Sequence, residues 1–120
     1  MFSAAKREAW LGRVDDVLAA IDRVEAFLRR TFVEAFRLDE WAVGAVAYQL
    51  IIMAEATKAM APGIEQRHPD FPWLKMWGMR NVLAHEYGRI DPEIVWAVAS
   101  DRFAPLRAAM LAERDWLEAQ

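Results

Sequence analysis

Hydrophobic residues in the first quarter of the chain recur with the spacing of a helix that packs lengthwise on another helix. The apolar positions between residues 3 and 32 follow alternating steps of four and three: Trp10, Val14, Val17, Ile21, Val24 and Leu28. This pattern predicts a long helix over residues 3–32 with one buried face. Ser3 is its candidate N-cap, because a serine hydroxyl can accept a hydrogen bond from an unpaired amide of the first turn.

A second helix is predicted from Asp39, another N-cap candidate, to Met60, where Pro62 and Gly63 stop it. Apolar residues cover most of its sides, which is typical of a helix at the centre of a bundle. Glu55 in its C-terminal half is the exception. Such a glutamate is a surface group, pairs with a nearby arginine, or reaches a functional site.

Proline and glycine residues mark where helices are expected to begin and end in the rest of the chain. A loop is expected over residues 62–72, and we interpret Arg67 and His68 in this loop as solvated side chains. A third helix is expected over residues 73–87, because a proline at residue 72 fits the first turn and Gly88 can end the helix.

A fourth helix is expected to begin at Asp91, an N-cap followed directly by a first-turn proline. Pro105 either kinks this helix or divides it in two. No segment shows the period-two alternation of a strand. The sequence therefore predicts an all-α, up-and-down bundle of four to five helices that forms a single domain over residues 1–120.

The composition narrows the class of protein. The 120 residues include no cysteine, which excludes a disulfide framework and a cysteine nucleophile. Two histidines without cysteines offer no metal-ligand set with usable spacing, so we expect neither a metal nor another cofactor. The most apolar stretch, residues 41–54, is too short for a membrane span, and charged residues precede any apolar run at the N-terminus. We therefore expect a cytoplasmic protein with no membrane partner.

The net charge of −3 bears on possible ligands. A protein that holds nucleic acid by charge alone usually has a strongly basic surface. Any RNA binding by this chain must therefore be local, or shared with a second copy or a partner.

Residues 79–88 bring together several chemically useful side chains on one predicted helix. Asn81 and His85 are one turn apart, so the amide can hydrogen-bond the imidazole and fix its tautomer. Tyr87 lies two turns beyond Arg80 on the same ridge. The apolar side of this helix is expected to carry Met76, Met79, Val82 and Leu83.

An arginine beside a histidine suits the cleavage of a phosphodiester. The neutral imidazole of His85 can take the proton of a ribose 2′-hydroxyl, and the guanidinium of Arg80 can hold the phosphate. The two residues are about 140° apart around the helix, so two copies facing each other across a two-fold axis would converge more readily than one chain alone. An arginine and a histidine on one helix are common, so the spacing by itself does not establish a site.

The segment resembles a known protein family. Arg80, His85 and Tyr87 stand in the order R-x4-H-x-Y, a form of the R-x4-6-H motif of HEPN-domain ribonucleases. The chain is similar in particular to the HepT-like toxins encoded beside MntA-like minimal nucleotidyltransferase antitoxins. The agreement extends to His68-Pro69 with Pro72-Trp73 before the motif and to Asp91 with Val95-Trp96 after it. Met53-Ala54 before Glu55 departs from the more usual Ile-Gly, where we expect only a packing difference.

The resemblance implies a toxin of a type VII-like toxin–antitoxin system, acting as a metal-independent endoribonuclease that leaves a 2′,3′-cyclic phosphate. It implies a homodimer whose motifs meet at the two-fold axis, with RNA as the substrate. Arg80 and His85 would be catalytic, and Asn81 would support the site. The cognate MntA-like antitoxin would neutralise the toxin by transferring AMP to Tyr87.

Two other interpretations compete with a ribonuclease. The chain could be the non-catalytic substrate-binding subunit of a two-component nucleotidyltransferase, because similar helical bundles serve that role. It could also be a structural adaptor that uses the face between Arg80 and Tyr87 as a dimer contact. Fold analogy does not separate these, since one fold hosts several functions.

Overall fold

The computed structural model describes residues 2–84 and 89–120, and every regular element in these residues is a helix. The helices are α1 (Ala4–Leu28), α2 (Val33–Arg37), α3 (Glu40–Lys58), α4 (Gly63–Arg67), α5 (Trp73–Ala84) and α6 (Pro92–Glu118). The prediction of an all-α bundle is confirmed. None of the helices in the described residues is long and apolar enough to cross a membrane.

Three of the long helices begin at the N-caps expected from the sequence. The Ser3 hydroxyl accepts a hydrogen bond from the Lys6 amide at 3.1 Å, at the start of α1. The Asp39 carboxylate caps α3 through the Ala42 amide at 3.1 Å, and Asp91 caps α6. Each cap satisfies an amide that has no partner within its own helix, so these starts are set by local chemistry.

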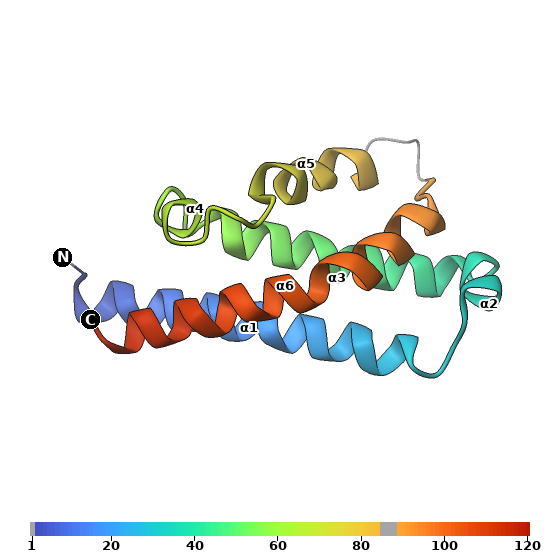
Figure 1. The fold of residues 1–120 in the computed structure, drawn as a ribbon. Coiled ribbons are helices and arrows are strands. Elements are labelled where there is room, and N and C mark those ends of the chain that lie inside the picture. Colours follow the sequence, from blue (N-terminus) through green and yellow to red (C-terminus); the bar gives the residue numbers. More distant parts are fainter. Residues whose placement is uncertain (1, 85–88) are drawn as a thin grey trace.

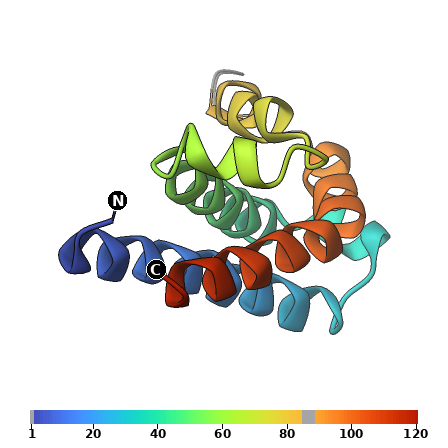
Figure 2. The ribbon, with the colours of Figure 1, turned by 60° about the vertical axis from the view of Figure 1, so that its left-hand side comes forward.

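The helices form an elongated bundle of about 48 × 28 × 25 Å. Helix α1 packs along both α3 and α6, and α5 lies against α3 (Figure 1). The short helix α2 turns the chain between α1 and α3 at one end of the bundle, and the two termini lie together at the other end (Figure 1, Figure 2). Helix α5 is thus held on the outside of the bundle, with α3 beneath it.

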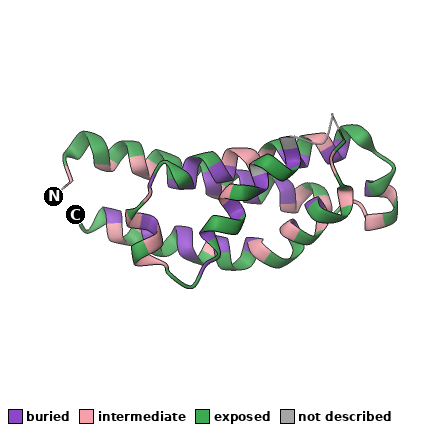
Figure 3. Ribbon diagram, turned by 90° about the horizontal axis from the view of Figure 1, so that it is seen from above, coloured by how far each residue is buried: buried purple, intermediate pink, exposed green. Residues whose placement is uncertain are grey.

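The core runs between the three long helices, and Figure 3 shows the buried positions on their facing sides. The fully buried side chains are mainly aliphatic or methionine: Val14, Val17 and Ile21 of α1, Leu50 and Met53 of α3, and Leu106, Met110 and Leu117 of α6. The spacing of Val14, Val17 and Ile21 is the one that predicted lengthwise packing of the first helix.

Three sequence expectations need correction. The loop expected over residues 62–72 contains the short helix α4, and the first helix ends at Leu28 rather than near Phe32. Of the two alternatives for Pro105, a kink or a division, the division of the last helix is wrong, because α6 is continuous from Pro92 to Glu118. Pro105 has no amide hydrogen to donate within α6, but the buried residues on either side of it, Phe103 and Leu106, hold the helix against the core. The expected end of the third helix at Tyr87 lies outside the described residues.

Candidate active site

Helix α5 is fixed on α3 by one apolar face. Trp73, Met76, Met79 and Leu83 are buried, at steps of three and four residues. The indole of Trp77 also donates a hydrogen bond to the Thr57 hydroxyl of α3 at 3.1 Å, and that hydroxyl donates to the Met53 carbonyl at 2.8 Å. These contacts fix the rotation of α5 about its own axis and therefore which residues face outward.

Of the four predicted site residues, only Arg80 and Asn81 belong to α5 as the structure describes it. Arg80 and Asn81 are in the last turns of α5, and Asn81 is exposed, as expected. The structure describes only the backbone of Arg80, and His85 and Tyr87 lie outside the described residues. The convergence of these four residues stays a prediction.

The outward face of α5 is more apolar than expected. Val82 was assigned to the core side, but it is 50% exposed, and Leu74 is 77% exposed. Gly78 lies between them, and a side chain added there would meet nothing within 4 Å. Leu74, Gly78 and Val82 are one turn apart from each other, so they form one outward stripe with a small residue at its centre.

The segment before α5 is anchored by a buried carboxylate that sequence analysis did not single out. Glu113 of α6 is completely buried and accepts hydrogen bonds from Arg67 Nε at 2.9 Å and from His68 Nε2 at 2.9 Å, as well as from Arg67 Nη2. The Arg67 guanidinium also stacks on the Trp116 ring, 3.7 Å from its centroid. The interpretation of Arg67 and His68 as solvated side chains is therefore wrong.

The electrostatics of this cluster favour an ionised carboxylate. Burial raises the pKa of Glu113, but the hydrogen bonds and charges of Arg67 and His68 outweigh it and hold that pKa below its ordinary value. The cluster also reaches α5, because the Trp73 indole donates to the His68 carbonyl at 2.8 Å. The start of α5 is thereby tied to α6 through the residues of the preceding segment.

A groove begins beside the C-terminal end of α5. One hollow of about 410 Å³ is lined by Val82 and Leu83 together with residues 89–92 and Ile94. A second, of about 890 Å³, shares Arg89, Ile90 and Pro92 with the first and extends to Trp41, Gly44 and Ala45 on α3. The two hollows therefore form one groove from α5 to the first turns of α3.

Charged groups around this groove are nearly balanced. Arg37 lines the larger hollow and forms an ion pair with Glu93 of α6, which lowers the pKa of the Glu93 carboxyl. Glu40 lines the same hollow, and Arg89 forms no ion pair with any described residue. Glu55, the outlying polar residue of α3, is exposed.

No set of three or more His, Cys, Asp or Glu side chains in residues 2–84 and 89–120 is placed to share a metal ion. The absence of a metal requirement is a separate, chemical question and stays a prediction.

Comparisons with known proteins identify the family. Residues 17–112 match the family model of HepT-like ribonucleases. A protein named probable ribonuclease HepT, from Thermococcus cleftensis, is 31% identical over 94 residues, which are 78% of this chain and 86% of that protein. A putative RNase of Methanocaldococcus jannaschii is 28% identical over 86 residues, which are 72% of this chain and 79% of its own. No solved structure matches the chain significantly. The chain belongs to the HepT-like ribonuclease family.

Proposed function

We propose that this chain is a metal-independent endoribonuclease and the toxin of a toxin–antitoxin pair. Membership of the HepT-like ribonuclease family is the observation that carries the proposal. The position of Arg80 and Asn81 in the last turns of α5, with Asn81 exposed and a groove beside Leu83, supports it.

The proposed chemistry is an attack within the RNA itself. His85 takes the proton of a ribose 2′-hydroxyl, and the resulting oxygen attacks the adjacent phosphorus. Arg80 pairs with the non-bridging phosphate oxygens and stabilises the charge that develops on them. The bond between phosphorus and the 5′-oxygen breaks, and this oxygen takes a proton from the protonated imidazole of the partner subunit's His85 in the proposed dimer. The products are a 2′,3′-cyclic phosphate and a 5′-hydroxyl, and no added nucleophile is consumed.

Substitutions at the two catalytic residues test this activity. Arg80→Ala and His85→Ala should each lower RNA cleavage by about 10²–10⁴-fold, since each removes a group that acts in the transition state. The rate is measured on single-stranded RNA in excess EDTA, where the parent chain should remain active. Arg13→Ala, on the exposed side of α1, is the matched control and should cut at the parental rate.

Circular dichroism should show unchanged helicity for all three variants, because none of the substitutions removes a residue of the described core. If His85→Ala cleaves RNA at the parental rate, the proposal of a ribonuclease is rejected and a non-catalytic binding subunit is favoured. Loss of parental activity in EDTA would reject metal independence alone.

The proposed control of the toxin is the attachment of AMP to Tyr87 by a minimal nucleotidyltransferase. The phenolic oxygen attacks the α-phosphorus of ATP and pyrophosphate leaves. The new phosphodiester carries a negative charge within the motif, where it would compete with RNA for Arg80.

Intact-mass spectrometry tests this modification. Incubation with the adjacent-gene nucleotidyltransferase, ATP and Mg²⁺ should add increments of one AMP and silence cleavage. The chain has two tyrosines, so Tyr48→Phe is the matched control. Tyr87→Phe should stay unmodified and active, whereas Tyr48→Phe should be modified like the parent. AMP on any other residue would remove Tyr87 from the mechanism.

A further inference from the structure

We propose that the groove beside α5 binds one nucleotide of a single-stranded RNA, with its base stacked on Trp41 and its phosphate held by Arg89. The proposal rests on the ribonuclease function above and assigns a substrate subsite to residues outside the R-x4-H-x-Y motif.

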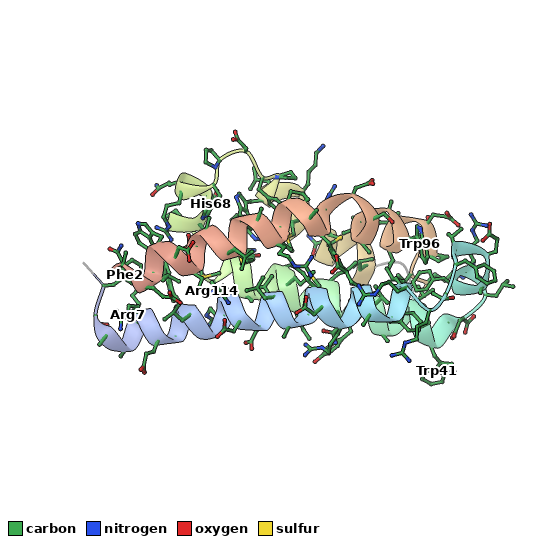
Figure 4. The ribbon with its side chains drawn as sticks, turned by 60° about the horizontal axis from the view of Figure 1, so that its bottom comes forward. Phe2, Arg7, Trp41, His68, Trp96 and Arg114 are labelled. Atoms are coloured by element: carbon green, nitrogen blue, oxygen red, sulfur yellow. The ribbon has the colours of Figure 1, made fainter. Side chains whose placement is uncertain are left out.

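Trp41 provides the stacking surface. Its side chain is 90% exposed in the first turn of α3, and it projects away from the helices at the end of the bundle near α2 (Figure 4). The other five tryptophans are buried or half-buried. An exposed indole costs hydrophobic free energy in the free protein, and a base stacked on it would remove that surface from water.

The surface beside Trp41 has room for a base. Gly44 and Ala45 follow it at steps of three and four on α3, so the residues next to Trp41 on its C-terminal side are small, and both line the same hollow. A side chain at Gly44 would meet nothing within 4 Å. The hollow of about 890 Å³ therefore offers open space directly against an aromatic face.

Arg89 provides the phosphate contact. It is exposed, lines both hollows and forms no ion pair with any described residue, in contrast to Arg37, which is paired with Glu93. A guanidinium with open hydrogen-bond donors suits a phosphate oxygen. Arg89 follows His85, the proposed general base, by four residues. A chain of four residues spans at most about 14 Å, so the Cα atoms of Arg89 and His85 are no farther apart than that. A phosphate bound there would belong to a nucleotide near the cleaved bond.

The charge of the groove favours a stacked nucleotide over a long anionic duplex. Glu40 and Asp91 line it together with Arg37 and Arg89, so attraction to many phosphates is weak. The Glu40 carboxylate can accept a hydrogen bond from a base amine or a ribose hydroxyl. Base faces are open in single strands and covered in duplexes, which selects single-stranded RNA.

Binding of a non-cleavable oligonucleotide tests the subsite. His85→Ala is the background, and a single-stranded RNA with 2′-O-methyl riboses is the probe. The probe should quench tryptophan fluorescence, and Trp41→Ala should abolish most of this quenching and weaken binding about tenfold. Trp41→Phe should keep most of the affinity. Arg89→Ala should weaken binding. It should also make the plot of the logarithm of the binding constant against the logarithm of the salt concentration less steep by about one unit.

Tyr48→Ala is the matched control, because Tyr48 is an exposed aromatic of α3 that does not line the groove. It should bind the probe like the parent. Parental affinity of Trp41→Ala would overturn the proposal. A loss of dimer mass in both Trp41→Ala and Tyr48→Ala would also overturn it, because this face of α3 would then contact a second copy.

The readouts keep the subsite separate from the catalytic proposal. If Trp41→Ala loses binding while His85→Ala still cuts RNA, the subsite stands and the catalytic assignment fails. If His85→Ala is inactive and Trp41→Ala binds the probe normally, the catalytic assignment stands and the subsite fails.

Discussion

Glu113 lies on the buried face of α6, where the neighbouring positions carry apolar side chains. It stands three residues after Met110 and four before Leu117, both of which are fully buried. A buried carboxylate needs a partner of opposite charge or a hydrogen-bond donor. A glutamate at helical spacing from Met110 and Leu117 is therefore a sign, visible in the sequence, that such a partner exists. The identity of the partners is not local information, because Arg67 and His68 are more than 40 residues away.

Substituting Glu113 should lower stability in a pH-dependent way. Because its pKa is held below the ordinary carboxyl value, its stabilising effect is present above about pH 4.3 and is lost as the pH falls through the folded-state pKa. Glu113→Gln should therefore lower the free energy of unfolding by about 2 kcal/mol at pH 7 and by much less at low pH. Urea unfolding at several pH values measures this difference.

Glu118→Gln is the control for this experiment, since Glu118 is exposed on the same helix. It should change stability by less than about 0.5 kcal/mol at every pH. A difference between Glu113→Gln and the parent that stays constant down to pH 3 would contradict the assignment of an ionised, paired Glu113.

Among the elements, the long helices were predicted because capping and periodicity are local properties of the sequence. Ser3, Asp39 and Asp91 all act as caps. Helix α4 was missed because its five residues are too few to show a period. Continuity through Pro105 depends on tertiary packing of α6, which outweighs the poor helix propensity of a single residue.

The orientation of α5 shows the limit of a helical wheel. Val82 lies about 95° from the centre of the buried face formed by Met76, Met79 and Leu83, so either side of the helix was possible for it. The contact with α3 decides the matter, and Val82 faces outward. The motif itself could be recognised from the sequence, whereas the groove joining Leu83 to Trp41 depends on how α3, α5 and α6 meet.

For the whole molecule, we expect a homodimer in which the two copies of α5 approach each other. The stripe of Leu74, Gly78 and Val82 exposes apolar surface around a small residue, which allows two helices to come close. An isologous contact there would bring the two copies of the last turn of α5, which directly precedes His85, near one axis. Gly78→Glu should convert the dimer to a monomer of 13.8 kDa, as measured by light scattering.

Gly12→Glu is the matched control, because Gly12 is also a helical glycine with open space around it, but on α1. It should keep the dimer mass. A parent chain that scatters as a monomer at micromolar concentration while cleaving RNA would contradict the dimer.

The meeting of the two chain ends has a consequence for how the bundle can be connected. Phe2 packs edge-on against Trp116, with ring centroids 5.2 Å apart, and Arg7 donates to the carbonyl of Gln120 at 3.5 Å. Phe2 and Arg7 lie at the opposite end of the molecule from Trp41 (Figure 4). A short linker could therefore join residue 120 to residue 2 without crossing the groove. New ends could then be opened between α1 and α2, giving a circular permutant with the same helix contacts and a different order along the chain.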